Sequence, residues 1–236
     1  FGLMVLDDGG EERMAAHYAR MKSLGEMLEH GIAVWDDEKE RFMKRAEFPL
    51  DAELHPRGHA LKRTVEGEEW FYFLTPFPDV RVRARLDHVL DPSKYEAVGG
   101  EAAGGPARAL EDAATGELVQ THGGTIAWNE HRGRWVMIAL EKFGTSALGE
   151  VWYAEAPSPD GPWSKAVKIV SHDDYSFYNL RHHPYFDDGR YLYFEGTYTA
   201  MFSGAEVRTP RWDYNQVMYR LDLDHPVLRK DFPENR

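Results

Sequence analysis

Residues 181–197 read RHHPYFDDGRYLYFEGT, and this short stretch has the pattern of a β-hairpin. Two histidines and a proline precede a short apolar segment, an Asp-Asp-Gly turn follows, and an aromatic segment then runs to Glu195. Turn residues between two segments rich in aromatic side chains predict a pair of antiparallel strands. A strand that is built for a core but ends on a glutamate raises the question of what that carboxylate does.

The same order of hairpins recurs along the chain. Each repeat has an apolar strand, a charged or Gly-containing turn, a second apolar strand, a loop, a third strand and a further turn. The second strands begin near Met14, Trp70, Trp135 and Tyr191, at spacings of 56, 65 and 56 residues. Four-stranded antiparallel units that recur in this way are typical of a β-propeller. The sequence therefore predicts an all-β fold, a β-propeller of four-stranded antiparallel blades.

Four blades are predicted within a single domain that covers residues 1–236. Their approximate ranges are 1–50, 51–100, 119–171 and 180–230. The Gly- and Ala-rich segment 99–118 lengthens the middle spacing, so we expect an exposed hairpin insertion there. A fifth blade and a missing upstream segment are expected, because the chain starts with Phe1 and enters a strand-like segment at once. The alternative architecture is a sandwich or two stacked β domains.

The fourth blade gives the predicted strands for the opening stretch. Its first three strands are expected at 183–186, 190–199 and 215–223. This interpretation places His182 and His183 in the loop that enters the blade, and Glu195 near the end of the second strand. The carboxylate would then lie on the same face of the propeller as the two histidines.

The composition excludes several classes of function. The chain has 236 residues and a formal net charge of −12, so nucleic acids and anionic membranes are poor partners. No apolar stretch is long enough to span a membrane. The absence of cysteine removes disulfides, thiolate metal sites and cysteine nucleophiles. A secreted or periplasmic location is favoured for a bacterial protein of this kind, although no signal peptide is visible.

The stretch PSPDGPWS at residues 157–164 is the most recognisable part of the sequence. It resembles the turn between outer strands in five-bladed propeller glycosidases of the glycoside hydrolase family 43 type, where it follows a strand similar to GEVWYAEA. The hairpins HRGRWVMI and DDGRYLYF also resemble that family, and the likeness covers residues 123–223. In physical terms, proline fixes φ, glycine allows the turn, and Trp163 is expected to cover the edge of the blade.

Histidines are concentrated in the segments predicted to connect the blades. Residues 51–59, 120–124 and 171–184 hold six of the 11 histidines: His55, His59, His122, His172, His182 and His183. In a propeller these connections share one face with the loops between second and third strands, so we expect a histidine-lined funnel. His59, His122 and His183 could hold a divalent cation there, calcium or another. The resemblance implies such a central cation, but the histidines could equally bond backbone carbonyls or substrate, and no cofactor is required.

Two glutamates are candidates for general acid and base chemistry in that funnel. Glu195 is predicted to end the second strand of the fourth blade, and Glu141 is predicted to hold the matching place in the third. Paired carboxylates are what cleavage of a glycosidic bond needs, and Asp173 and Asp174 are further candidates for the base. The alternative for Glu195 is a structural ion pair with an arginine. The candidate partners are Arg181, Arg208 and Arg211.

Other residues on the predicted face could contact a substrate. Arg57 stands between His55 and His59 in HPRGH and could bind a sugar carboxylate, or it could brace its own loop. Trp212 and Tyr214 in TPRWDYN could form a platform for a sugar ring, or they could pack at an edge. With His122, His182, His183, Arg208 and Arg211 they complete the predicted substrate-binding set.

The sequence departs from the resembled family at the starts of the inner strands. These read HPRGH, THGG and RHHP, and none has the carboxylate that family 43 places on or near its inner strands. We therefore expect a carbohydrate-active propeller, and specifically a glycoside hydrolase with Glu195 as the acid. The alternatives are a non-hydrolytic carbohydrate-binding propeller and a metal-dependent lyase in which His and Tyr transfer protons. A carbohydrate is the expected partner, and the oligomeric state stays open.

Overall fold

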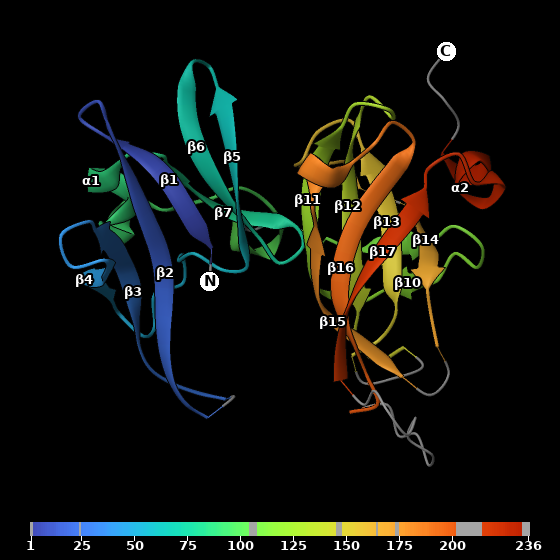
Figure 1. Ribbon diagram of the computed structural model, residues 1–236, viewed down its shortest axis with the longest axis horizontal. Helices are drawn as coiled ribbons and strands as arrows, with labels where there is room; N and C mark the ends of the chain where they lie inside the picture. The colour runs from blue at the N-terminus through green and yellow to red at the C-terminus, as the bar shows by residue number, and fades with distance from the viewer. Residues whose placement is uncertain are drawn as a thin grey trace. The chain divides into compact units, whose positions relative to one another are not determined.

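The computed structural model describes residues 2–23, 25–103, 108–144, 148–163, 165–172, 175–201 and 214–232. The chain divides into two compact units, Phe1–Pro106 and Ala107–Arg236. Each unit contains two sheets whose strands are almost all antiparallel (Figure 1).

The first unit is built from sheets 1 and 2. Sheet 1 has the order β1 (Leu3–Asp8), β2 (Glu11–Ser23), β3 (Glu26–Asp36) and β4 (Arg41–Phe48). Sheet 2 has the order β5 (His59–Val65), β6 (Glu68–Leu74), β7 (Pro78–Arg83) and β8 (Glu96–Ala97). Three short helical segments complete the unit: α1 (Leu86–Val89) and the 3₁₀ turns η1 (Pro92–Lys94) and η2 (Gly100–Ala103).

Local sequence explains these hairpins. Residues of β7 alternate between buried and half-buried, as expected when one face of a strand packs on a core. Glu66 and Gly67 connect β5 to β6 with φ of 53° and 83°, the two positive values of a type I′ turn. The fully buried side chains of the unit, among them Met4, Ile32 and Val82, form one core cluster shared by both sheets.

The second unit is built from sheets 3 and 4. Sheet 3 has the order β10 (Leu118–Val119), β9 (Leu110–Asp112), β14 (Lys165–Val170), β13 (Val151–Ala156), β12 (Arg134–Glu141) and β11 (Thr121–Asn129). Sheet 4 has the order β15 (Ser176–His182), β16 (Tyr191–Thr199) and β17 (Tyr214–Asp222). The remaining elements are the 3₁₀ turn η3 (Pro184–Phe186) and α2 (Pro226–Asp231).

The core of the second unit lies between sheets 3 and 4. All six residues of β13 are buried, so this central strand is covered on both faces. Val136, Tyr153, Phe177 and Phe194 belong to one core cluster, which also includes Leu228 of α2. The packing of this interface therefore fixes the relative position of the two sheets within the unit.

Two strand predictions differ from the structure. The first strand of sheet 4 is Ser176–His182 and not 183–186, because Pro184, whose φ is fixed by its ring, begins η3 instead. Sheet 4 also has three strands among the described residues. After β17 the chain forms α2, whose first residue is Pro226 and whose N-cap is His225, a sequence that favours a helix start.

Two other segments are placed as follows. Within the predicted insertion, β9 and β10 pair as a hairpin, and β9 extends the edge of sheet 3 beside β14. Leu110 and Val119 are buried, so this hairpin is less exposed than expected. In PSPDGPWS, Trp163 is buried and its indole N–H donates to the carbonyl of Pro159 at 2.9 Å, which closes the turn on itself.

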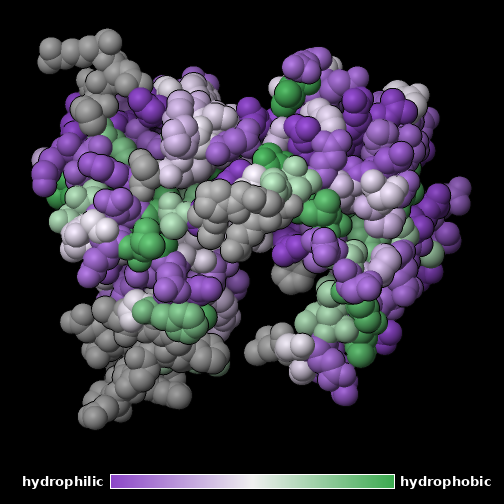
Figure 2. Space-filling model, turned by 180° about the vertical axis from the view of Figure 1, so that it is seen from behind, coloured by the Kyte–Doolittle hydropathy of each residue, from purple (hydrophilic) through white to green (hydrophobic). Residues whose placement is uncertain are grey.

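The fold class is the predicted one, an all-β chain whose four sheets are β-propeller blades. The fifth blade and the single-domain arrangement stay predictions. No helix in the described ranges is long and apolar enough to cross a membrane. The face in Figure 2 is mostly hydrophilic, with hydrophobic side chains gathered near the end of the β2–β3 hairpin, where Met21 and Leu28 are exposed.

Candidate active site

Two glutamates meet at the end of sheet 3 that lies opposite the β11–β12 turn. Glu141 is the last residue of β12, and Glu150 directly precedes β13. The backbone N–H of Glu141 donates to the carbonyl of Glu150 at 3.0 Å, and the carboxyl groups of both side chains lie against Gly144. Two carboxyl groups this close repel each other when both are ionised, which favours a proton on one of them.

The surroundings of Glu141 favour its protonated form. Burial, followed by the hydrogen bond and the negative charge of Glu150, raises the pKa of Glu141 above its usual value. The indole N–H of Trp152 donates to Oε2 of Glu141 at 2.8 Å, and this bond and the charge of Lys168 act in the opposite direction but do not prevail. Glu150 is only 1% exposed, so water does little to screen the repulsion between the two carboxylates.

The loop between β12 and β13 is shaped around the pair. A Cβ placed on Gly144 would lie 2.0 Å from Oε2 of Glu150 and 2.9 Å from Oε2 of Glu141. His122, an exposed residue of β11, donates from Nε2 to the carbonyl of Leu148 at 3.1 Å. Since Thr121 is the register partner of Glu141, this histidine lies beside the carboxyl pair and holds its loop.

Glu195 is placed differently from the prediction. It is the fifth of nine residues in β16, and the strand continues to Thr199 because β17 pairs with it along this whole length. Glu141 is the last residue of its strand, so the two glutamates do not hold matching places. The carboxylate of Glu195 lies 3.3 Å from Nε2 of His183, at ion-pair distance but without the alignment of a hydrogen bond.

His183 also contacts a phenol on its other side. Its Nδ1 lies 2.7 Å from the hydroxyl of Tyr185, a residue of η3 that is 73% exposed. The Phe186 ring packs against Tyr185, with centroids 4.5 Å apart. Glu195, His183 and Tyr185 thus form a row of carboxylate, imidazole and phenol that leads from the sheet to solvent.

His182 has a structural environment. It is the last residue of β15 and is 3% exposed, and its Nε2 donates to the carboxylate of Asp187 at 3.0 Å. The same carboxylate accepts bonds from the side chain of Asn129 and the backbone N–H of Tyr193. Because β15 ends here, His182 and His183 lie beside the β15–β16 connection rather than in the loop that enters sheet 4.

A cluster of histidines, made up of His17, His30 and His55, lies in the first unit. The rings of His30 and His55 are 4.8 Å apart, and His17 Nε2 lies 3.2 Å from His30 Nδ1. His30 and His55 also donate to the carbonyls of Pro49 and Ala52. Only His55 of this cluster was singled out from the sequence, since His17 and His30 lie in the middle of strands.

The remaining predicted residues of this unit are placed as follows. Arg57 is exposed and donates to the carbonyl of Glu53 at 2.6 Å, a contact within its own loop. His59 is the first residue of β5 and is partly buried. Among the described residues no group of three or more His, Asp or Glu side chains could hold a metal ion. The trio of His59, His122 and His183 draws on both units, so it stays a prediction.

Several predicted site residues lie outside the described residues. They are Asp173, Asp174, Arg208, Arg211 and Trp212. Tyr214, which was predicted to form a sugar platform with Trp212, is the first residue of β17 and is 54% exposed. Its hydroxyl contacts that of Tyr178. The roles assigned to all of these residues stay predictions.

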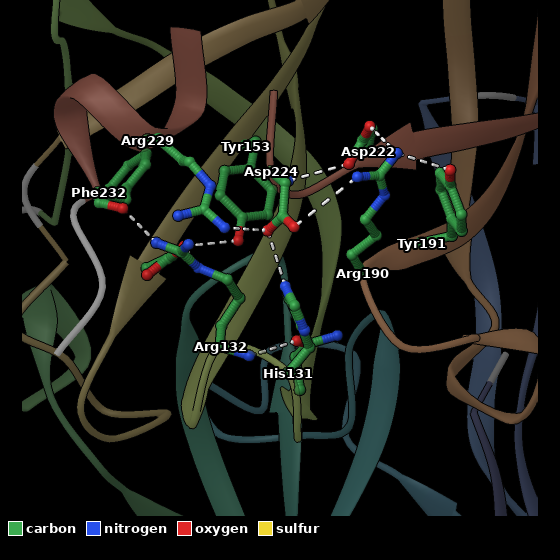
Figure 3. A network of polar contacts seen from close by, with 11 residues as sticks. His131, Arg132, Tyr153, Arg190, Tyr191, Asp222, Asp224, Arg229 and Phe232 are labelled. Atoms are coloured by element: carbon green, nitrogen blue, oxygen red, sulfur yellow. Dashed lines mark hydrogen bonds and ion pairs between the residues drawn. The ribbon is translucent and has the colours of Figure 1, made fainter. Parts of the chain in front are cut away.

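The opposite end of the second unit holds a charged network that joins the turns to α2 (Figure 3). Arg132 and Glu155 have side chains that are 3% and 4% exposed, and their Nε and Oε1 atoms are 2.8 Å apart. Arg132 also donates to the carbonyl of Phe232, beyond α2. Asp224 accepts from His131 and Arg229, each at 2.8 Å. These groups are paired with opposite charges, so we interpret the network as structural.

Glu150 and Trp152 are the site residues that sequence reasoning missed. Both belong to GEVWYAEA, which was used only as a strand that marks the resemblance. The available signal was that Glu141 and Glu150 flank one loop between neighbouring antiparallel strands. Such a loop brings its two ends together, and hence also the two carboxyl groups.

No known family model matches the chain, and no curated protein sequence matches it. Among solved structures, an endo-1,5-α-L-arabinanase from Thermotoga petrophila RKU-1 is 14% identical with a TM-score of 0.49, over 95% of this chain and 57% of that one. An endo-arabinase from Bacteroides thetaiotaomicron VPI-5482 is 17% identical with a TM-score of 0.43, over 93% of this chain and 74% of that one.

An N-acetylgalactosamine deacetylase from F. plautii is 8% identical with a TM-score of 0.43, over 93% of this chain and 70% of that one. A thermostable family-43 glycoside hydrolase is also among the similar structures, and this is the family that the turn at 157–164 resembles. The chain spans just over half of the length of the Thermotoga arabinanase. At these identities and scores nothing about substrate or reaction follows for this chain.

Proposed function

We propose that this protein is a glycoside hydrolase in which Glu141 donates the proton to the leaving group. The observation that carries the proposal is the close pair of carboxyl groups, Glu141 and Glu150, at the end of sheet 3. Cleavage of a glycosidic bond needs a carboxylic acid that is still protonated at the working pH, and a raised pKa provides it. In this step the O–H bond of Glu141 breaks, the glycosidic oxygen takes the proton, and the C1–O bond releases its electrons to that oxygen.

Glu150 supports this acid but is not the opposing carboxylate. In glycosidases the two catalytic carboxyl groups stand about 5–9.5 Å apart, whereas the carboxyl groups of Glu141 and Glu150 lie closer together, both against Gly144. The base or nucleophile must come from elsewhere, and we assign it to one of Asp173, Asp174 or Glu195. Glu150 is a positioning residue, since its negative charge holds the proton on Glu141.

The proposal is tested by reducing-sugar release from plant and algal polysaccharides and aryl glycosides. Glu141→Gln should lower kcat by about 10²–10⁴-fold, the usual contribution of a general acid, with a melting temperature no lower than that of the wild type. The matched control is Glu29→Gln, because Glu29 is a buried glutamate of the first unit that pairs with Lys44 and Arg20. Turnover that survives in Glu141→Gln would contradict the role of Glu141. Tight sugar binding without any turnover would favour a non-hydrolytic binding propeller.

A second candidate function rests on the row of Glu195, His183 and Tyr185. A base that removes the proton next to a uronic acid carboxylate, and an acid that protonates the leaving oxygen, complete a β-elimination. In this row His183 can accept the proton of the Tyr185 phenol, which is exposed to substrate, and the resulting phenolate removes the proton next to the carboxylate. As the C=C bond forms and the bond to the leaving oxygen breaks, the protonated His183 gives its proton to that oxygen. This lyase reaction forms a C=C bond, so ultraviolet absorbance by products of polygalacturonate or alginate measures it. Tyr185→Phe should abolish that absorbance, whereas Glu141→Gln should leave it intact.

A further inference from the structure

A separate cavity of about 330 Å³ lies in the first unit. It opens where the β1–β2 and β3–β4 turns approach α1. Apolar and charged side chains line it together. Those that bear on its chemistry are Trp35, the carboxylates Asp8, Asp36, Asp37 and Glu38, and the arginines Arg13 and Arg45. None of them belongs to the predicted site or to the carboxyl pair of sheet 3.

Trp35 supplies a fixed aromatic wall. Its indole N–H donates to Asp37 at 3.0 Å, and the edge of Phe42 packs against it with ring centroids 5.3 Å apart. The ring is half-buried, so part of it faces the cavity. A ring that is held from two sides loses little conformational entropy when a ligand stacks on it.

The rim offers hydrogen-bond donors and acceptors together. Asp8 lies 3.6 Å from Nε of Arg13, so this acid and base are held side by side. Within the described ranges the side chain of Arg45 forms no hydrogen bond or ion pair, which leaves its donors available. A sugar hydroxyl both donates and accepts, and a rim of paired carboxylates and guanidinium groups can satisfy both roles.

The charges of the rim select among ligands. Four carboxylates face two guanidinium groups, so the cavity carries a net negative charge and disfavours anionic ligands. These carboxylates do not form a group that could hold a metal ion. The volume is at the lower end of the range of about 300–1,000 Å³ for ligand pockets. A cavity of this size fits a short segment of a polymeric ligand.

We propose that this cavity is a second, non-catalytic binding site for a neutral saccharide, with Trp35 stacking on a sugar ring and Arg13 and Arg45 bonding its hydroxyls. The choice of a saccharide rests on the proposed function. The site would hold one part of a polysaccharide while another part is cleaved. Activity on short aryl glycosides would then be independent of it.

The test is affinity electrophoresis of the whole chain in gels that contain arabinan, xylan, galactan or mixed-linkage glucan, beside gels with polygalacturonate. All variants carry Glu141→Gln, so binding is measured without turnover. We expect retardation by a neutral polysaccharide that Trp35→Ala weakens roughly tenfold or more, equivalent to about 1.4 kcal/mol. Arg45→Gln, which removes no existing contact, should weaken it by a smaller factor.

The matched control is Trp128→Ala, which removes a 40% exposed indole that packs edge-on against Trp135 in the other unit. Retardation that is unchanged in both Trp35→Ala and Arg45→Gln, that occurs only with polygalacturonate, or that is absent from every gel would overturn the proposal. Retardation that depends on Trp35 in a chain whose wild type cleaves nothing would sustain this site and refute the proposed hydrolase.

Discussion

The two ends of sheet 3 each hold buried glutamates, and their partners differ. At one end Glu155 accepts hydrogen bonds from Arg132 and from the hydroxyl of Tyr153. At the other end Glu141 meets a second carboxyl group, Glu150. A buried carboxylate with an arginine is ionised and joins parts of the fold. A carboxyl with another carboxyl keeps a proton, which costs stability at neutral pH and provides an acid.

The largest expected effect on stability is the loss of the ion pair between Arg132 and Glu155 at one end of sheet 3. Arg132→Ala leaves Glu155 buried without its cation and should reduce the free energy of unfolding by about 3–5 kcal/mol. Urea denaturation of the whole chain measures it. The control Arg134→Ala removes an arginine that is 30% exposed and 3.9 Å from Glu155, and should cost about 0–1 kcal/mol. Equal losses of unfolding free energy in both variants would show that the buried contact of Arg132 contributes no more than the partly exposed contact of Arg134.

The next effect concerns the space around the carboxyl pair. In Gly144→Ala the added methyl group would overlap Oε2 of Glu150, so the pair must move apart. We expect a loss of stability of about 1–3 kcal/mol, as for overpacked sites, and a fall in kcat. Gly123→Ala is the control, since nothing lies within 4 Å of a Cβ at that position in β11. Full activity in Gly144→Ala would mean that the contact between the carboxyl groups is dispensable.

The histidine cluster of the first unit predicts a dependence of stability on pH. Burial, followed by the nearby His30 and His55, lowers the pKa of His17 from 6.5 to about 4. Between these values the unfolded chain binds a proton at this position and the folded chain does not. Stability should therefore fall as the pH drops from 6.5 towards 4, in thermal melts across that range.

The variant that isolates this effect is His17→Gln, which removes the titrating group and should flatten the pH dependence. His88→Gln changes a histidine outside the cluster and should keep the wild-type slope. An equally steep slope in His17→Gln would assign the effect to other groups.

The smallest expected effect is a gain in stability when Glu141 is replaced. The raised pKa of Glu141 means that its folded-state stabilisation is complete below pH 4.5 and is lost as the pH rises through the raised value. Glu141→Gln removes the carboxylate charge that forms as the pH rises, so at pH 8 it should be more stable than the wild type. A gain of about 1 kcal/mol would raise the melting temperature by roughly 2–4 °C. A lower melting temperature at pH 8, relative to wild type, would argue against the raised pKa of Glu141.

Most of the fold could be predicted from local sequence. In the first two hairpin turns the positive φ angles fall on Gly9, Gly10 and Gly67, but also on Glu66, which is not a residue that favours such an angle. The second strands predicted to begin near Met14 and Trp70 begin at Glu11 and Glu68. The first strand of sheet 4 was missed, because the segment PYF at residues 184–186 looks like part of a strand in the sequence. Its backbone instead follows the restriction on φ that proline imposes and forms η3.

The candidate site was only partly predictable. Glu141 was singled out because it ends an apolar strand, and the structure does place it at the end of β12. Its partner Glu150 was not found, because the loop that the two glutamates flank was not used to pair its ends, and the spacing of nine residues alone does not show that the side chains meet. The contact of His183 with Glu195 was not predicted, because an arginine was the expected partner of that carboxylate. Of the candidate arginines, Arg181 lies opposite Glu195 in the register of β15 and β16.

By itself the sequence determined the all-β class, the order of the hairpins and the absence of thiol chemistry, since alternation, turn residues and composition act locally. Only the tertiary structure decided which carboxyl groups meet one another and which meet a cation. A side chain's proton affinity depends on the charges within a few ångströms and on its burial. Both are set by strand register and loop closure, which bring together residues that the sequence keeps apart.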